Sequence, residues 1–356
     1  MFDPIKASKE IKDSYIDYIT TTFDMADTDY EREFRKELQT DGMVASGPFL
    51  DIGGSYETGH TLRELIQAQK ASILFENLEP VAEKERELKL DRPLYQHQET
   101  AMLKADKGEN LVVTTGTGSG KTESFLLPII NHLLREQEAG TLSAGVRAII
   151  IYPMNALAND QMKRMRALFK NYPQICYGVY NGNTEHTQSK ALAEYHRTYH
   201  DEAGEPIDPA PNEIISREVM QERPPHILIT NYSMLEYMML RPKDDAVFSG
   251  AKLKFIVLDE AHIYKGATGM ETSLLMRRLR ARISEPDSVQ YILTSATLGG
   301  PDADGDILSF AEKLCGVAFQ RSGIIRSTEK RPAMEDFLDF APALFEELQR
   351  SPDISS

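Results

Sequence analysis

The 356-residue sequence contains no tryptophan and only two cysteines, Cys176 and Cys315. Neither cysteine has a second cysteine or a paired histidine nearby, which argues against a disulfide framework and a zinc site and fits a reducing cytoplasm. No apolar run approaches the roughly 20 residues that a membrane-spanning helix needs. The N-terminal segment MFDPIKASKEIKDSY is charged from its start and has no apolar centre, unlike a signal peptide. These absences predict a cytoplasmic protein with no membrane partner.

Positive charge is also scarce, because 40 lysines and arginines stand against 55 aspartates and glutamates, for a formal net charge of −15. Proteins that coat duplex nucleic acid are usually basic, so any nucleic-acid binding here would depend on a local track. Hydrophobic residues make up 41% and charged residues 27% of the chain, an ordinary balance for a soluble protein. The length suffices for one large domain or two ordinary ones.

Two regions with different patterns follow each other along the chain. Residues 1–90 are highly charged, and their helical spacing of apolar positions predicts an N-terminal helical extension. Residues 91–320 alternate apolar runs with helical patterns, which predicts an α/β fold with a mostly parallel sheet flanked by helices. The candidate strands are 110–114, 146–152, 176–180, 226–230, 253–258 and 289–294. The helices expected between them cover 121–136, 155–171, 231–240 and 269–284.

Residues 181–225 interrupt this alternation, since they are polar, rich in proline and long, and we expect an insertion with one or two short helices. His196 and His200 would share a helix face there, at the spacing of a metal-binding pair. No third ligand is evident, so a solvated helix face is the favoured interpretation. Residues 321–356 form a C-terminal tail, in which FLDFAPALFEELQR predicts a helix.

The segment 110–129, NLVVTTGTGSGKTESFLLPI, places a glycine-rich turn between an apolar strand and an apolar helix. In such a turn, backbone N–H groups and the helix N-terminus face phosphate oxygens. Lys121 can then reach the β- and γ-phosphates, and the Thr122 hydroxyl can ligate Mg²⁺. The usual fingerprint has glycine where this chain has Thr115, a turn position that another small residue can fill. The pattern predicts a nucleoside triphosphate site formed by Thr115, Gly116, Thr117, Gly118, Ser119, Gly120, Lys121 and Thr122.

A second motif, FIVLDEAH at 255–262, ends an apolar strand in two consecutive carboxylates. Asp259 stands at the strand end, where it can hold Mg²⁺, usually through water. Glu260 can orient or deprotonate the water that attacks the γ-phosphate. Together with Lys121 and His262, these carboxylates form the set of candidate catalytic residues.

The ordered motifs TGTGSGKT, DEAH and TSATLGG (294–300) resemble motifs I, II and III of superfamily 2 DEAD/DEAH-box helicases. The resemblance covers roughly residues 90–320 and implies a RecA-like P-loop NTPase domain, the first of two that hold ATP between them. This family accepts a small residue other than glycine at the position of Thr115. In its third motif, Ser295 and Thr297 would couple ATP hydrolysis to the grip on the strand.

Three further segments match the family by resemblance. LYQHQ (94–98) is similar to the glutamine motif, so Gln98 would hydrogen-bond the adenine base. YPMNALANDQ (152–161) and TNYSMLEYMM (230–239) are similar to motifs Ia and Ib, which grip one nucleic-acid strand in helicases. The candidates for these strand contacts are small hydrogen-bonding residues at strand ends and helix starts, which suit phosphates: Asn155, Thr230 and Asn231.

The same motifs resemble those of large bacterial helicases, some associated with phage defence, and this narrower likeness favours DNA over RNA. Only 59 residues follow Thr297, whereas a second RecA-like domain needs roughly 150. We therefore expect that domain to be absent from this chain and to be supplied by the same parent protein or in trans. The chain alone would bind ATP and Mg²⁺ but hydrolyse ATP slowly, because an arginine finger contributes about 10³–10⁵ in rate.

Two other functions stay open. The chain could drive the remodelling of protein–nucleic-acid complexes instead of duplex unwinding, and every motif is shared between these two functions. It could also be a non-catalytic module that uses ATP as a structural ligand, although intact Lys121, Asp259 and Glu260 argue against that function.

Overall fold

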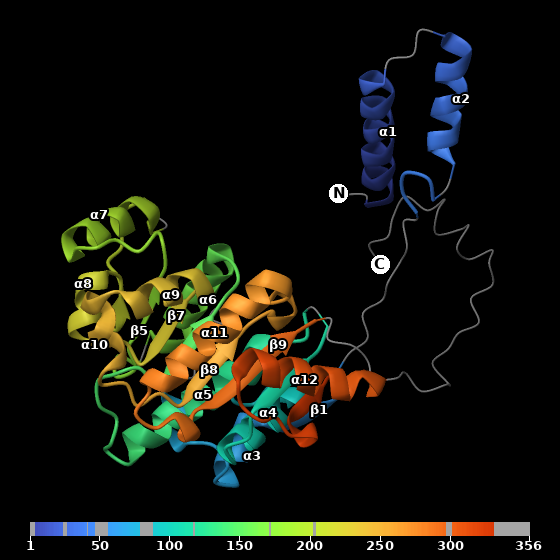
Figure 1. Cartoon of the computed structure of the whole chain (residues 1–356). Helices are drawn as coiled ribbons and strands as arrows, with labels where there is room; N and C mark the ends of the chain where they lie inside the picture. Colours follow the sequence, from blue (N-terminus) through green and yellow to red (C-terminus); the bar gives the residue numbers. More distant parts are fainter. Residues whose placement is uncertain are drawn as a thin grey trace. The chain divides into compact units, whose positions relative to one another are not determined.

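The computed structural model describes residues 4–23, 27–40, 42–46, 56–78, 88–116, 118–170, 172–201, 204–296 and 301–330 (Figure 1). The chain divides into two compact units, Met1–Ser55 and Tyr56–Ser356. In the first unit, α1 (Pro4–Thr22) packs against α2 (Thr28–Gln39). An ion pair between Arg35 and Asp17 joins these two helices.

The second unit is built on one eight-stranded sheet in which all neighbouring strands run parallel. The strand order across the sheet is β10–β3–β9–β8–β4–β7–β5–β6. The strands are β3 (Leu111–Thr114), β4 (Ala148–Ile151), β5 (Tyr177–Tyr180), β6 (Glu213–Ile214), β7 (Ile227–Thr230), β8 (Phe255–Leu258), β9 (Gln290–Ser295) and β10 (Ile324–Arg326). The predicted α/β fold with a mostly parallel sheet is confirmed.

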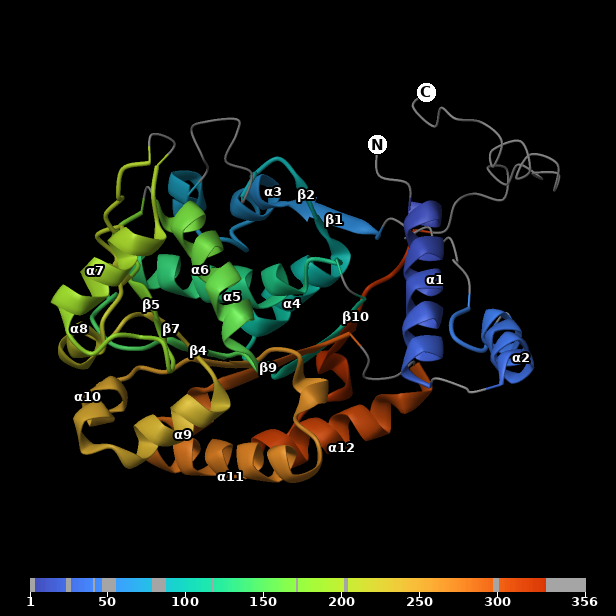
Figure 2. The same cartoon turned by 90° about the horizontal axis from the view of Figure 1, so that it is seen from above.

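Helices cover both faces of this sheet (Figure 2). Apolar side chains of α4 (Gln96–Asp106), α5 (Lys121–Glu138) and α6 (Asn155–Phe169) form the core on one face. On the other face the core contains side chains from α9 (Tyr232–Leu240), α10 (Asp245–Phe248), α11 (Gly266–Arg282) and α12 (Asp304–Cys315). Every residue of β4, β7 and β8 is buried, which accounts for their unbroken apolar sequences.

The segment ahead of the sheet packs onto it. It contains two strands, β1 (Thr58–Thr61) and β2 (Pro93–Tyr95), which pair in an antiparallel manner. Between them in the sequence come the short helix α3 (Leu62–Gln67) and a 3₁₀ turn at Ile73–Leu78. Apolar residues of α3 and of this turn belong to the same core as α4 and α5. The second unit thus begins near residue 56, whereas sequence spacing grouped residues up to 90 with the N-terminal extension.

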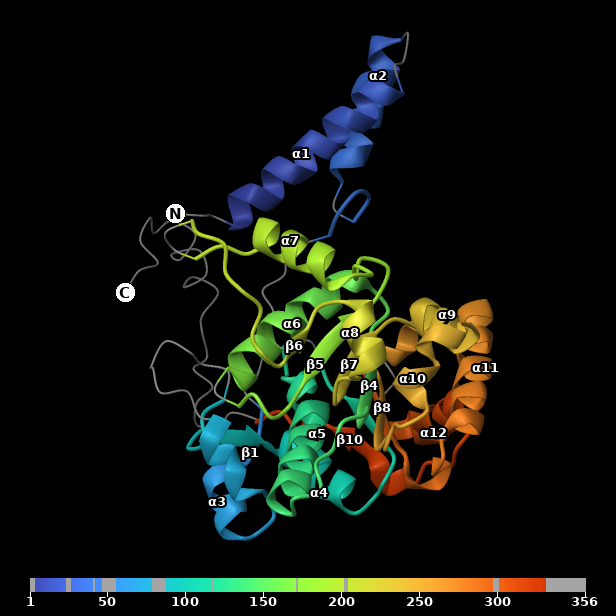
Figure 3. The ribbon, with the colours of Figure 1, turned by 90° about the vertical axis from the view of Figure 1, so that its left-hand side faces the viewer.

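Both edges of the sheet carry strands that the sequence did not indicate. Residues 181–225 contain α7 (Gln188–Thr198), the edge strand β6 and α8 (Arg217–Glu222), seen beside β5 in Figure 3. At the opposite edge, β10 pairs with β3, with Ile325 beside Val113. Strands of two or three residues hold too little pattern to be recognised from sequence.

The remaining short elements are 3₁₀ turns at Pro242–Asp244, Ala261–Ile263, Pro286–Ser288, Pro301–Ala303 and Arg321–Gly323. Within the ranges that the structure describes, no helix is long and apolar enough to cross a membrane. The helix predicted for FLDFAPALFEELQR lies outside the described residues.

Candidate nucleotide and nucleic-acid site

The phosphate loop connects β3 to α5. Gly118 and Gly120 have φ angles of +75° and +72°, in a left-handed region that glycine adopts readily and other residues rarely do. The side chain of Thr115 is buried, and its Oγ1 lies 2.7 Å from Oγ of Ser119. Ser119 Oγ also lies 2.8 Å from the carbonyl oxygen of Gly116. Thr115 therefore braces the turn at the position where the usual fingerprint has glycine.

Lys121 is the first residue of α5, and the partial positive charge of the helix N-terminus adds to its own. Its Nζ lies 3.2 Å from Oε1 of Glu260, and the side chains are 11% and 25% exposed. In the sheet, β9 lies between β3 and β8. The phosphate loop that follows β3 and the carboxylates that follow β8 are therefore only one strand apart.

The consecutive carboxylates follow the carboxyl end of β8. Thr294 on β9 donates its hydroxyl to Oδ1 of Asp259 and accepts the N–H of Glu260 at 3.2 Å. Burial raises the pKa of Asp259, and the hydrogen bond from Thr294 opposes this effect. Glu260 has φ of +48°, a conformation that costs energy for a residue with a side chain and clusters at functional sites. Thr294 is the first residue of the third motif, but only Ser295 and Thr297 were given roles there. The strand register places Thr294 next to the end of β8.

His262 and Ser295 link the carboxylates to the phosphate loop. Nδ1 of His262 lies 3.3 Å from Oε2 of Glu260 and 3.2 Å from Oγ of Ser295. The carbonyl of Ser295 accepts the N–H of Thr115 at 3.1 Å. Ser295 therefore contacts both the loop and the carboxylate motif. Outside the described residues lie two other candidates from these motifs, Thr117 and Thr297.

Gln98 connects its own motif to the phosphate loop. Its Oε1 accepts the N–H of Tyr95, and its Nε2 donates to the carbonyl of Gly120, both at 3.0 Å. A Cβ on Gly120 would lie 2.4 Å from this Nε2, so the close approach requires glycine. In this structure the amide holds the phosphate loop through one N–H and one lone pair.

An aromatic cluster lies beside this glutamine. The rings of Tyr95 and His97 stack at 5.6 Å between centroids, and the ring of Tyr56 meets both edge-on at 5.5 and 5.9 Å. Nε2 of His97 lies 2.9 Å from the carbonyl oxygen of Ser119, and burial lowers the pKa of this histidine. A Cβ built on Gly116 would lie 3.1 Å from the Tyr56 hydroxyl. Tyr56 lies outside every sequence motif, and no pattern indicated it.

The candidate strand-contacting residues gather at the carboxyl ends of β4 and β7. Nδ2 of Asn231 donates to Oδ1 of Asn155 at 2.8 Å, while Oδ1 of Asn231 accepts the N–H of Met234 and caps α9. Thr230 is buried, and its hydroxyl donates to the carbonyl of Tyr180 at 2.7 Å. The two asparagines thus form one polar pair, and the Thr230 side chain joins β7 to β5.

An ion pair joins α6, the helix that begins at Asn155, to the start of α5 in the nucleotide site. Arg164 of α6 pairs with Glu123, two residues after Lys121. Their side chains are only 21% and 16% exposed, and Oε2 of Glu123 is buried without a hydrogen-bond partner. An ion pair so poorly solvated is costly to break from one side.

The candidate metal ligands are the histidines of the insertion and the oxygens beside the phosphate loop. Over the described ranges, no group of three or more His, Cys, Asp and Glu side chains could hold a metal ion. In the insertion, Nε2 of His196 lies 2.7 Å from Oδ1 of Asp208. A nucleotide-bound Mg²⁺ needs only one or two protein oxygens, because phosphates and waters complete its shell. The Thr122 hydroxyl and the Asp259 carboxylate carry oxygens of the kind that Mg²⁺ prefers.

This chain is similar to known helicases in sequence. The family model of the DEAD/DEAH box helicase matches residues 95–203 and 204–304. The Druantia protein DruE of Escherichia coli is 32% identical over 91% of this chain and 22% of its own length. The uncharacterized ATP-dependent helicase YprA of Bacillus subtilis is 31% identical over 61% of this chain and 24% of its own length. The chain thus spans about a quarter of these relatives.

Solved structures show the same fold at lower identity. The DUF1998 helicase MrfA bound to DNA has a TM-score of 0.52 at 23% identity, covering 77% of this chain and 31% of that one. The DEAD-box helicase Mss116 bound to ssRNA and UDP-BeF has a TM-score of 0.56 at 17% identity, covering 78% and 47%. The family model covers more than half of the sequence, and the chain belongs to the DEAD/DEAH box helicase family.

Proposed function

We propose that this chain is the ATP-binding motor domain of a helicase or translocase, which binds ATP·Mg²⁺ and one nucleic-acid strand, with DNA favoured over RNA. The observation that carries the proposal is the meeting of Lys121, Asp259 and Glu260 beside a loop with two left-handed glycines. Relatives in Bacillus subtilis and Saccharomyces cerevisiae are named ATP-dependent helicases. Titration with a fluorescent ATP analogue tests nucleotide binding, and titration with a labelled single strand tests nucleic-acid binding. The proposal would be contradicted if neither ligand bound.

The contacts suggest how nucleotide binding prepares hydrolysis. Without a triphosphate, Lys121 neutralises Glu260. A γ-phosphate that takes over the lysine frees this carboxylate to accept a proton from an attacking water. Thr122 and Asp259 would hold Mg²⁺, which neutralises charge on the phosphate oxygens when bound. Gln98 holds the phosphate loop at Gly120, and Ser295 contacts both the loop and the carboxylate motif.

The proposal includes a second RecA-like domain, in the same parent protein or in trans, that closes over the nucleotide. Arg321 and Arg326, which follow the third motif, both pair with Asp304, at 2.8 and 2.6 Å. Their guanidinium groups are therefore already paired with a carboxylate in this structure. The relatives are about four times as long as the part that this chain matches, which is compatible with such a domain in a parent protein.

Strand binding is expected to depend on the asparagine pair. Asn155→Ala removes a group suited to a phosphate oxygen and leaves the Asn231 amide without its partner. We expect about tenfold weaker binding of a single-stranded oligonucleotide, as for the loss of one hydrogen bond to a charged group. Fluorescence anisotropy measures the change. Gln67→Ala, which removes an exposed amide from the end of α3, is the control, and equal effects of both variants would contradict the assignment.

The choice between nucleic acids needs a direct measurement. One structural neighbour is described as bound to DNA and another as bound to ssRNA, so the fold accommodates both. Competition between DNA and RNA strands of equal length and sequence separates them, and tighter binding of RNA would contradict the DNA preference. Displacement of a protein from a strand, compared with displacement of a complementary strand, distinguishes remodelling from unwinding.

Arg164 and Glu123 are expected to transmit binding between the two sites. Arg164→Gln leaves Glu123 buried without its cation, so the factor by which a single strand changes ATP affinity should fall towards one from the 5–150-fold typical of coupled sites. ATP titrations with and without the strand measure this factor. Lys163→Gln, an exposed neighbour on the same helix, should leave it unchanged. Restored coupling in the charge-swapped double variant Glu123→Arg, Arg164→Glu would support the pair, and an unaltered factor in Arg164→Gln would refute it.

A further inference from the structure

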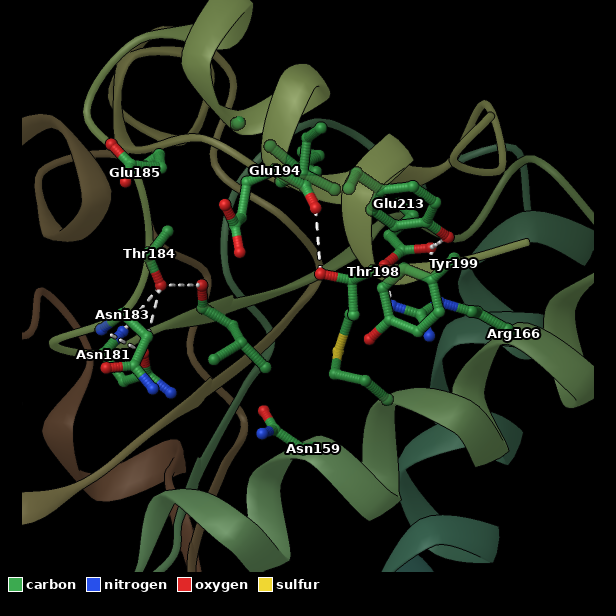
Figure 4. A pocket seen from close by; sticks show the side chains of 16 residues that line it. Asn159, Arg166, Asn181, Asn183, Thr184, Glu185, Glu194, Thr198, Tyr199 and Glu213 are labelled. Atoms are coloured by element: carbon green, nitrogen blue, oxygen red, sulfur yellow. Dashed lines mark hydrogen bonds and ion pairs between the residues drawn. The ribbon is translucent and has the colours of Figure 1, made fainter. Parts of the chain in front are cut away.

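A second pocket lies away from the nucleotide site, at the carboxyl ends of β5 and β6 (Figure 4). Its volume is about 180 Å³. Asn159 of α6 lines one side, the segment Asn181–Glu185 after β5 lines another, and α7 contributes the third. The walls therefore come from both the common sheet and the insertion at 181–225.

The segment after β5 is held in place before any ligand arrives. Arg217 of α8, which is buried, donates to the carbonyl of Asn181 at 2.9 Å and to that of Gly182 at 3.3 Å. Oδ1 of Asn181 accepts the N–H of Asn183, and the Thr184 hydroxyl donates to the carbonyl of Val179, both at 2.8 Å. The polar rim is thus preorganised by the insertion.

The charges of the pocket exclude a phosphate. Among the described residues that line it, Arg166 is the single cation, and it donates to both oxygens of Glu213 at 2.8 and 2.7 Å. The ring of Tyr199 covers this guanidinium at 4.2 Å. Two further carboxylates, Glu185 and Glu194, stand on the rim. An anion would meet this surplus of negative charge, whereas a neutral group rich in N–H donors would be attracted.

The interior of the pocket suits a flat, partly apolar ligand. Met162, Val179, Ala191 and Ile214 provide an apolar lining, and the rim provides amide and carboxylate oxygens as acceptors. Adenine, cytosine and guanine combine an apolar face with an exocyclic amino group, which thymine and uracil lack.

We propose that this pocket receives one unstacked nucleobase of the bound strand, with preference for a base that carries an exocyclic amino group. This assignment rests on the proposed function. Its geometric basis is the strand order, because β4, β7, β5 and β6 are consecutive in the sheet. A strand that passes the Asn155–Asn231 pair at β4 and β7 reaches the pocket two strands further along the same edge.

The test varies one base along an otherwise uniform strand. A labelled oligothymidine carries a single cytosine, or a single abasic site, at each position in turn, and its dissociation constant is measured by anisotropy. We expect one position at which cytosine strengthens binding about five- to tenfold over thymine, as for roughly 1–1.4 kcal/mol of base recognition. The abasic site should weaken binding at that same position.

Variants decide whether this position is read by the pocket. Asn159→Phe fills the pocket from an exposed helix position and should abolish the dependence on base identity. Ala193→Phe adds the same ring to an exposed position of α7 outside the pocket and should preserve it. Glu194→Gln, which retains the shape but removes an anionic acceptor, should reduce the preference for cytosine.

Two outcomes would overturn the assignment while leaving the proposed function intact. One is strand binding with no sensitive position, and the other is the same sensitivity in Asn159→Phe as in the unaltered chain. Failure of every oligonucleotide to bind would instead contradict the proposed function, and the base pocket with it.

Discussion

Replacing Lys121 with alanine is expected to lower the affinity for ATP·Mg²⁺ about 100-fold. The lysine Nζ is largely buried at the N-terminus of α5, and its observed partner Glu260 shows that a negative oxygen fits at 3.2 Å. A hydrogen bond between charged groups contributes about 1.5–3 kcal/mol, which corresponds to a factor of roughly 10–150. Isothermal titration with a non-hydrolysable ATP analogue measures the loss.

The control for this experiment is Lys107→Ala, which removes an exposed lysine at the end of α4 and should leave ATP affinity unchanged. Circular dichroism checks that both variants keep the helical content of the unaltered chain. Retention of full ATP affinity by folded Lys121→Ala would remove the basis of the nucleotide-site assignment.

Replacing Glu260 with glutamine is expected to slow ATP hydrolysis about 10²–10⁴-fold while ATP still binds. The amide keeps the shape of the side chain but cannot accept a proton from water. Because the pair with Lys121 loses its charge, ATP should bind no more weakly than before, since it no longer competes with a carboxylate. Single-turnover hydrolysis of labelled ATP, with the chain in excess, detects the slow rates expected of this domain alone.

Glu271→Gln makes the same replacement at an exposed position of α11 and should retain the original rate. If Glu260→Gln hydrolyses ATP as fast as the unaltered chain, another group activates the water. If it loses ATP affinity as well, the carboxylate contributes to binding and not only to the chemical step.

The central strands were predictable because each is a run of apolar residues that must be buried on both faces. β4, β7 and β8 belong to this class, and their predicted positions match the structure to within a few residues. The packing of residues 56–78 was not predictable, because their apolar residues are compatible with any neighbouring hydrophobic surface. These residues pack against α4 and α5 because of tertiary contacts, and such contacts leave no pattern in the local sequence.

Within the site, sequence motifs located the groups but not their present contacts. Gln98 matched a base-reading motif, yet its amide spans Tyr95 and Gly120 in this structure. Thr294 precedes the residues singled out in the third motif, and its role emerges only when β9 lies beside β8. Spacing along the chain identifies chemistry, whereas hydrogen-bond partners depend on the register between strands.

The edge strand β10 has a mechanical consequence. It runs parallel to β3, the strand that leads into the phosphate loop, and three residue pairs join the two strands. Tension applied to the chain beyond Arg326 acts on this contact and on the bonds that Thr328 and Glu329 make with Glu57 and Tyr56. The evenly spaced bonds of the parallel pair share the part of the load that reaches β3, the strand that leads into the phosphate loop.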